Sequence, residues 1–401
     1  MNIKFLVSWA MLALLSCDPA VKKKQDESSK PGDFGYDKAF LQTHLPEMIL
    51  LYGDDSLHQK ILVAPEYQGR VMTSTIAGDE GISLGWINHH VIAQKKPEPH
   101  ITAVGGEDRF WLGPEGGQFS VYFKQDAPFV FENWQVSLAL DTEPFIVVRK
   151  TAHEVQFEKT IQLTNYSGKE LTVRVDRTVK VLSNLDMTQM IGLPLDGVQM
   201  VGFTSVNTIW NAGKEDWTRS TGALSIWILG MMKAAENTRI IVPLQQGASP
   251  GKGITTNYFG EIPPERLTID SVSLQLKADG KYRAKIGISQ SVAKSWIGSY
   301  DEENELLTLV HYNLPSDPLP YVNSLWEIQQ QPFSGDVVNA YNDGPVKGKQ
   351  LGDFYELETS SPAALLKKEE AITHRHTTIH VSGTKEQLNT IAIKLLGTPL
   401  N

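Results

Sequence analysis

The chain of 401 residues contains a single cysteine, Cys17, which excludes a disulfide within the chain and a zinc site built from cysteines. Basic residues are also in the minority, since 37 Lys and Arg stand against 46 Asp and Glu and leave a formal charge of −9. Nucleic-acid binding normally needs a basic surface, so no nucleic-acid partner is expected. Apolar residues make up 41% of the chain, which is enough for a packed core and excludes a wholly disordered protein.

The N-terminal apolar run, Phe5–Leu15, is too short to span a membrane, because a spanning helix needs about 20 residues. With Lys4 ahead of it, the run is typical of a secretory signal peptide. It ends in Leu14-Leu15-Ser16-Cys17, which resembles the bacterial lipobox. That resemblance implies cleavage before Cys17 and lipidation of this residue. An ordinary signal peptide that happens to contain a cysteine is the alternative.

Three segments are therefore expected along the chain. They are a signal peptide at 1–16, a lipidated Cys17 with a flexible tether at 17–36, and one folded domain at 37–401. Residues 18–33 hold almost no bulky apolar side chains, so burial cannot offset the entropy lost on ordering them. The expected location is the cell envelope, with the lipid on Cys17 anchoring the protein in a membrane, at the periplasmic face or the cell surface. The sequence leaves the oligomeric state open.

Alternation with a period of two residues dominates the chain after residue 36, which is typical of strands with one buried face. Strands are predicted at 60–65, 69–76, 119–123, 145–150, 153–165, 171–182, 223–229, 239–243, 271–276, 282–288, 324–330, 336–342, 354–360 and 373–381. Helical signal is sparse. The capping-box pair Thr384 and Gln387 with the stop signal Gly397 predicts one C-terminal helix, over a sheet edge or end. The fold class is therefore all-β, as a large antiparallel sandwich or barrel with a short C-terminal helix.

The residues best suited to acid–base chemistry lie in the last two predicted strands. Glu356 and Glu358 are two apart, so they share one face of their strand, and His374, His376 and His380 share a face of the next. If the two faces meet, the set can transfer protons or hold a divalent metal ion through His nitrogen and Glu oxygen. The metal candidates are Glu356, Glu358, His374 and His376, although nothing in the sequence requires a cofactor. Side chains that merely solvate an exposed strand pair are the alternative.

The segment around Glu358 resembles the C-terminal motif of the aldose 1-epimerases (galactose mutarotases). Leu357-Glu358-Thr359 is followed, as in those enzymes, by a Ser-Ser-Pro segment and a Lys-Glu-Glu turn. The resemblance implies a large antiparallel supersandwich, a sugar ligand, and Glu358 as the base that takes the anomeric hydroxyl proton. A closer likeness, over most of residues 40–383, is to mutarotase-like lipoproteins and secreted proteins of Bacteroidetes. Blocks at 105–118, 341–345 and 355–359 carry it.

One part of the epimerase pattern is missing. Those enzymes carry an Asn-His pair ahead of an aromatic-Asn element, and its histidine protonates the ring oxygen. The comparable place here reads Leu163-Thr164-Asn165-Tyr166, without a histidine. The acid must then come from elsewhere, and the candidates are His374, His376, His89 and His153.

Two glycine- and tryptophan-containing blocks offer groups that can hold a sugar. Five glycines in 105–118 permit turns and close approach to a ligand, and the block lacks the Lys-Ser/Thr ending of a phosphate loop. The block 206–219 places two tryptophans near Asn and Arg. With the turn at 341–345, the expected sugar-binding residues are Arg109, Trp111, Glu115, Gln118, Asn207, Trp217 and Asp343. Bracing of loops, core packing of the tryptophans and an ordinary turn are the structural alternatives.

The function that follows is that of a membrane-tethered, carbohydrate-active protein with an epimerase-like site. Glu358 is the expected base, and Glu356 is expected to position it or raise its pKa. A non-catalytic glycan-binding lipoprotein is one alternative. A lyase or hydrolase is another, because a fold does not dictate a reaction.

Overall fold

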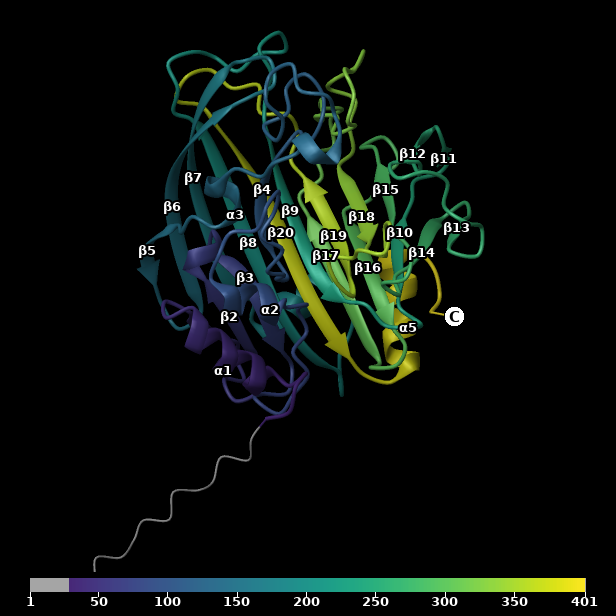
Figure 1. Ribbon diagram of the computed structural model, residues 1–401. Coiled ribbons are helices and arrows are strands. Elements are labelled where there is room, and N and C mark those ends of the chain that lie inside the picture. The colour runs from purple at the N-terminus through teal and green to yellow at the C-terminus, as the bar shows by residue number, and fades with distance from the viewer. Residues whose placement is uncertain (1–28, 401) are drawn as a thin grey trace, which may run out of the picture.

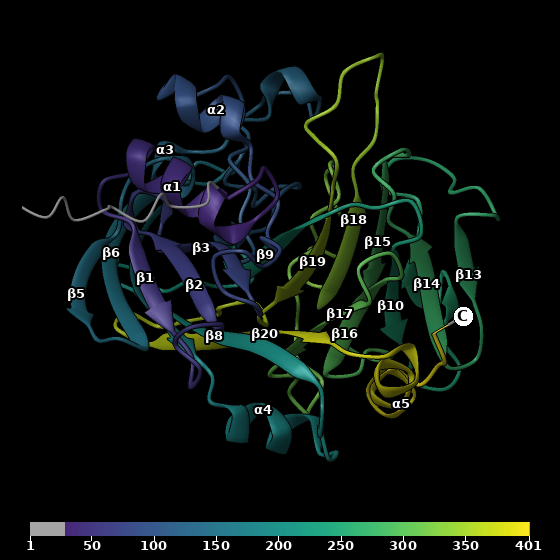
Figure 2. The same cartoon turned by 90° about the horizontal axis from the view of Figure 1, so that it is seen from below.

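The computed structural model describes residues 29–400, in which two large, almost wholly antiparallel sheets pack face to face (Figures 1 and 2). Cys17 and the predicted signal peptide lie outside the described residues. The larger sheet has, in spatial order, β13 (Leu267–Ile269), β14 (Ser273–Lys277), β10 (Arg239–Pro243), β16 (Trp296–Asp301), β17 (Leu306–Tyr312), β20 (Ala371–Ser382), β8 (Gln199–Asn211), β7 (Glu170–Val181), β6 (Glu154–Thr164) and β5 (Ile146–Lys150).

The second sheet carries the candidate site. Its order is β11 (Ser249–Pro250), β12 (Gly253–Thr255), β15 (Ala284–Ile288), β18 (Val338–Asn342), β19 (Phe354–Ser360), β9 (Ser225–Lys233) and β4 (Arg109–Gly113). A third sheet joins β1 (Ile49–Tyr52), β2 (Lys60–Ala64) and β3 (Arg70–Thr75). The short helices α2 (His89–Gln94) and α3 (Leu138–Asp141) and the 3₁₀ turns Pro65–Tyr67 and Phe131–Asn133 lie between strands.

Alternation of apolar and polar residues builds the sandwich, as predicted. In β7 every second side chain from Leu171 to Val181 is buried, and β6 shows the same pattern. These inward side chains meet those of the other sheet in a shared core, where Val155, Phe157 and Ile226 are essentially inaccessible. The all-β supersandwich predicted from the sequence is confirmed.

The C-terminal helix α5 (Lys385–Leu396) also forms as predicted, with both hydrogen bonds of its capping box. The amide of Gln387 donates to Oγ1 of Thr384 at 3.3 Å, and the amide of Thr384 donates to Oε1 of Gln387 at 2.9 Å. The helix lies on the outer face of the ten-stranded sheet with α4 (Asn184–Ile191), as Figure 2 shows, and its buried Leu388 packs there. It therefore covers a face, where an edge or end was expected.

The folded domain begins before the predicted boundary at residue 37. Helix α1 spans Phe34–His44, Phe34 is fully buried, and its amide donates to the carbonyl of Gly81 at 2.7 Å. Burial of the Phe34 and Leu41 side chains favours docking of this end of the predicted tether on the core. No helix within residues 29–400 is long and apolar enough to cross a membrane.

The strand predictions fail at two kinds of place. Segments 119–123 and 324–330 are irregular, and in the second the side chain of Gln329 binds the carbonyls of Asn323 and Leu325 in place of a strand ladder. Conversely, β4 forms inside the glycine-rich block that was expected to be a loop. Strands β1, β8, β16 and β17 were also missed.

Candidate functional site

Strand register gathers polar side chains on one face of the seven-stranded sheet. Glu358 of β19 pairs with Asn339 of β18 and with Leu229 of β9, which in turn pairs with Arg109 of β4. Residues in register point to the same side of a sheet. The next row on that face holds Lys285, Tyr341, Glu356 and Met231.

Glu358 is the most deeply buried carboxylate of this face, with no solvent exposure. Its Oε2 accepts a hydrogen bond from Nε1 of Trp227 at 2.9 Å and lies 3.2 Å from Nζ of Lys285. Its Oε1 has no hydrogen-bond partner within residues 29–400. Glu358 therefore has one oxygen held by the protein and one left to accept a hydrogen bond.

Lys285 is held in its charged form by its surroundings. Burial lowers the pKa of Lys285, but the carboxylates of Glu358 and Glu115 outweigh that effect and leave the pKa above its ordinary value. The ammonium also lies 4.9 Å from the ring centroid of Trp227, within cation–π range. Glu358 and Lys285 thus form a buried ion pair backed by an aromatic ring.

A narrow pocket lies against this ion pair. Its walls are Gly113, Ser225, Trp227, Tyr258, Lys285, Val322, Ser324, Asp336, Asn339 and Ser360. Glu358 is not part of the wall, but both of its hydrogen-bonding partners are, so it lies directly behind them. The space open to a water-sized sphere is about 10 Å³, which accommodates about one water molecule.

Asp336 is the carboxyl that lines the pocket itself. It accepts a hydrogen bond from the hydroxyl of Tyr258, and Nδ2 of Asn339 lies 3.4 Å from the same oxygen. Burial raises the pKa of Asp336 to about 6, although these two hydrogen bonds act in the opposite direction. A carboxyl that titrates near neutral pH can both accept and donate a proton.

Glu356 lies next to Glu358 on the same face of β19 and has a raised pKa. Burial, followed by the charge of Glu358, raises the pKa of Glu356 well above its ordinary range. Burial likewise raises the pKa of Glu115. Glu356 is therefore driven toward its neutral form.

The histidines do not join this site, so the predicted convergence is wrong. Oγ1 of Thr359 bonds to Nε2 of His374 at 2.8 Å and to Nδ1 of His376 at 2.9 Å. Consecutive residues of a strand point to opposite faces, so Thr359 and Glu358 face different sides of β19. His374 and His376 therefore lie in the layer between the two large sheets, behind the strand that carries Glu358.

The burial of these imidazoles is also inconsistent with a role as the catalytic acid. Burial lowers the pKa of His374 to about 3 and that of His376 to about 4, so both are neutral at pH 7. His380 lies in the same strand and bonds to Oε2 of Glu107 at 2.7 Å. The other two candidates are engaged elsewhere, His89 with Asp37 and His153 with the carbonyl of Tyr52.

The predicted metal ligands also lie on opposite sides of β19. Glu356 and Glu358 lie on one face of β19, whereas His374 and His376 lie behind the other face. Within residues 29–400, no group of three or more His, Cys, Asp or Glu side chains is placed to hold a metal ion.

Arg109 and Trp111 lie on the site face but are packed into it. The Arg109 guanidinium stacks 3.8 Å from the ring centroid of Trp111 and lies 3.3 Å from Oδ1 of Asp141. Trp111 is 4% exposed, and its Nε1 donates to the carbonyl of Leu140 at 3.1 Å. The indole supports the wall and has no free face for a sugar.

Gln118 and Asp343 brace loops beside the site. Gln118 both donates to the carbonyl and accepts from the amide of Gln329, which fixes the 105–118 block to a distant segment. Asp343 accepts from the hydroxyl of Tyr341 and from the amides of Leu351 and Gly352. These polar groups are used within the protein, as the bracing alternative expects.

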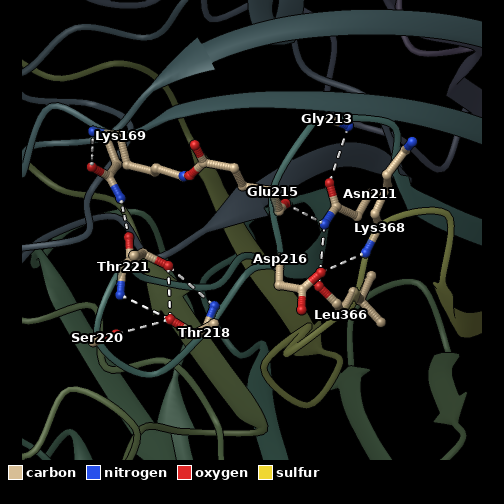
Figure 3. A network of polar contacts seen from close by, with 11 residues as sticks. Lys169, Asn211, Gly213, Glu215, Asp216, Thr218, Ser220, Thr221, Leu366 and Lys368 are labelled. Carbon is tan, nitrogen blue, oxygen red and sulfur yellow. Dashed lines mark hydrogen bonds and ion pairs between the residues drawn. The ribbon is translucent and has the colours of Figure 1, made fainter.

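Asn207 and Trp217 lie in the core and have no surface for a ligand. Asn207 is fully buried against Arg177, and Trp217 is 2% exposed. Figure 3 shows the polar contacts that brace the C-terminal part of this block. Nδ2 of Asn211 donates to the carbonyls of Glu215 and Leu366, and Lys169, Asp216, Thr218, Thr221 and Lys368 extend the network. The block 206–219 is therefore structural.

The sequence did not reveal five residues of this site. They are the carboxyl group of Asp336 and the residues that contact Glu358 or Asp336, namely Lys285, Trp227, Tyr258 and Asn339. One signal was available, because Lys285 stands between apolar residues in a predicted strand, where a charge needs a partner. Tyr258 lies outside any strand and left no pattern to detect.

Residues 32–401 match the family described as "Family of unknown function (DUF6786)", and the chain belongs to this family. No curated protein matches the chain in sequence.

Solved structures share the fold at low sequence identity. A "Putative aldose 1-epimerase" from Escherichia coli K12 is 12% identical, with a TM-score of 0.50 over 84% of this chain and 99% of its own. The Slr1438 protein from Synechocystis sp. PCC 6803 is also 12% identical, with a TM-score of 0.51 over 84% of this chain and 96% of its own. A galactose mutarotase-like protein from Lactobacillus casei ATCC 334 is 11% identical, with a TM-score of 0.47 over 83% of this chain and 99% of its own. The fold is that of the aldose 1-epimerase-like proteins.

Proposed function

We propose that the protein is a carbohydrate-active enzyme that moves protons at a sugar, with Glu358 as the base and Asp336 as the acid. The observation that carries this proposal is the state of Glu358, a fully buried carboxylate with one oxygen held by Trp227 and Lys285 and the other without a partner. The aldose 1-epimerase-like fold and the resemblance of the segment 357–359 to the epimerase motif support a sugar as the ligand.

In the proposed reaction, Oε1 of Glu358 accepts the proton of the anomeric hydroxyl while Asp336 donates a proton to the ring oxygen. The ring C–O bond then breaks, its electron pair stays on the protonated ring oxygen, and the open-chain aldehyde recloses with either configuration. Trp227 and Lys285 hold Oε2 of Glu358 in a fixed orientation. Asp336 takes the place of the histidine that the sequence lacks.

A sugar must widen the pocket before it can react, because the present space holds about one water. Tyr258 is the wall residue best placed to move, since it lies outside any strand and its neighbour Phe259 is 44% exposed. The second candidate is a glycan-binding protein without turnover, because no sugar fits the reaction pocket as it stands and binding can take place elsewhere on the surface. That candidate requires binding without any new product.

Anomer-resolved NMR of a panel of aldoses separates these functions. We expect the wild-type protein to accelerate interconversion of anomers, and Glu358→Gln and Asp336→Asn each to lower kcat by at least about 100-fold, as for lost acid–base catalysts. The matched control is Glu158→Gln, on the solvent-exposed side of β6, which should leave the rate unchanged. Unchanged turnover in Glu358→Gln would sink the assignment of the base, and a shortened or unsaturated product would indicate a hydrolase or lyase.

The proposal also places the enzyme in the cell envelope, tethered through a lipid on Cys17. The support is the N-terminal sequence, an apolar run too short to span a membrane that ends in a lipobox-like Leu-Leu-Ser-Cys.

A further inference from the structure

A groove lies beside the pocket and takes no part in the proposed reaction. The space open to a water-sized sphere in it is about 830 Å³, within the range of about 300–1,000 Å³ that is typical of ligand sites. Its walls come from four parts of the chain: residues 245–246 after β10, 289–291 and 293 between β15 and β16, 314–316 and 318–319, and the paired segments at 321 and 333–335.

The groove and the pocket share one thin wall. Tyr321 lines the groove and the next residue, Val322, lines the pocket. In the same way, Gly335 lines the groove and Asp336 lines the pocket. The amide of Gly335 donates to the carbonyl of Tyr321 at 2.9 Å, so the two segments are bonded to each other. A Cβ on Gly335 would lie 1.9 Å from the carbonyl oxygen of Val322, which shows how closely the backbones approach. The two spaces are therefore adjacent.

The groove lining has no charged side chain, in a protein whose residues are 21% charged. Its polar groups are amides and hydroxyls, such as those of Gln245, Gln246 and Ser316, which both donate and accept hydrogen bonds. The amides of Gln245 and Gln246 are exposed and make no side-chain hydrogen bond within residues 29–400. Phe333, which is half-buried, adds an aromatic ring to the lining, whereas Tyr321 is 2% exposed and lies within the wall.

A ligand with charges would find no counter-charge in this lining and would lose hydration on entering. A neutral chain of hydroxyl groups matches it, because each hydroxyl can donate to an amide oxygen and accept from an amide N–H, while sugar C–H faces pack on aromatic rings.

We propose that the groove binds an uncharged oligosaccharide beside the pocket at Asp336. This inference goes beyond the proposed function, and binding in the groove does not depend on turnover. The groove thus selects a neutral glycan longer than one sugar unit as the ligand.

Calorimetry with the full-length protein in detergent tests this. The probes are maltohexaose, xylohexaose and mannohexaose as neutral glycans, hexagalacturonate as an acidic one, and an uncharged decapeptide of Gln, Ser and Pro. We expect at least one neutral hexasaccharide to bind and hexagalacturonate and the peptide not to bind. Ser316→Trp, which fills the groove from an exposed position, should weaken binding at least about tenfold.

The matched control is Ser56→Trp, on the exposed loop between β1 and β2, which should leave the affinity unchanged. The proposal is overturned if no neutral hexasaccharide binds, if Ser316→Trp binds as well as wild type, or if the acidic glycan or the peptide binds more tightly.

Two readouts keep this proposal separate from the proposed function. Glu358→Gln should retain hexasaccharide affinity although turnover is lost, and Ser316→Trp should retain turnover of a free aldose. Binding without turnover in the wild type would reject the proposed enzymatic function and support the oligosaccharide-binding groove. Turnover without hexasaccharide binding would support the enzymatic function and reject the groove.

Discussion

Nζ of Lys285 lies 3.2 Å from Oε2 of Glu358, and their side chains are 9% and 0% exposed. Their strands are not neighbours, since β18 runs between β15 and β19, so the pair reaches across a whole strand. Two charged groups that are buried this deeply lose much of their hydration. Their mutual attraction offsets that loss only while both partners remain. This coupling makes the pair testable by stability as well as by activity.

Lys285→Met should destabilise the fold by about 3 kcal/mol at pH 7, because it leaves the buried carboxyl group of Glu358 without its ion-pair partner and held by Trp227 alone. Adding Glu358→Gln to that variant should restore most of the loss, as measured by urea denaturation. The control Lys281→Met removes a solvent-exposed pair with Glu236 and should change little. Additive effects of Lys285→Met and Glu358→Gln would contradict the coupling.

Thr359→Val should destabilise the protein by about 1–3 kcal/mol, because the hydroxyl bonded to both His374 and His376 is lost inside the sandwich. Thr373→Val is the matched control in β20, the strand that carries the two histidines, since its hydroxyl bond to Thr208 is exposed to solvent. Thermal denaturation compares the two. Equal stability of both variants would mean that Thr359 does not anchor the histidines.

Stability should fall as the pH is lowered from about 6.5 toward 4. The folded-state pKa values of His374 and His376, about 3 and about 4, lie below the ordinary 6.5, so in this range the unfolded chain binds protons that the native state does not. The slope should approach about 1.4 kcal/mol per pH unit for each imidazole. Urea denaturation across this range checks it, and His376→Gln should flatten the slope. A slope that is the same in His376→Gln and wild type would contradict the assignment.

Asp336 should act on stability with the opposite sign. Its pKa of about 6 lies above the ordinary 3.8, so the native state holds a proton that the unfolded chain releases, and its contribution is lost as the pH rises from about 4 through 6. Asp336→Asn removes this opposing effect and should make the rise of stability with pH steeper. A shallower rise in the same denaturation series would argue against a raised pKa.

Tyr258→Phe should move the alkaline limb of the pH–rate profile to higher pH. Asp336 must be protonated to act as the acid, so turnover should decline as the pH rises through about 6. The Tyr258 hydroxyl bonds to the charged carboxylate and lowers its pKa, and removing that bond raises the pKa. The profile of kcat/KM against pH measures the shift. A limb that stays in place would separate Asp336 from catalysis.

Cys17→Ser should abolish lipidation and release the protein from the membrane fraction. Labelling of growing cells with a fatty-acid analogue, followed by fractionation, checks both effects. Label on the wild type and none on Cys17→Ser is the expected result. Equal labelling of the two proteins would contradict the anchor.

Within the candidate site, the sequence predicted strand β19 itself but not the strands that surround it. Its range, 354–360, and the shared face of Glu356 and Glu358 follow from the alternation alone. The strands that lie beside β19 and over its two faces do not follow from the alternation, because alternation does not show which strands are paired. β20 belongs to the other sheet, so its histidines approach the opposite face of β19.

The single cysteine, the period-two pattern and the capping-box signal by themselves determined the expected anchor, the all-β class and the C-terminal helix, because each rests on neighbours within about a dozen residues. The tertiary structure alone decided which ionisable groups meet. Lys285 and Asp336 join Glu358 from strands and loops far away in the chain, and no local pattern records such a contact. In this fold, one step along β19 separates the candidate reaction site at Glu358 from the buried histidine layer at Thr359.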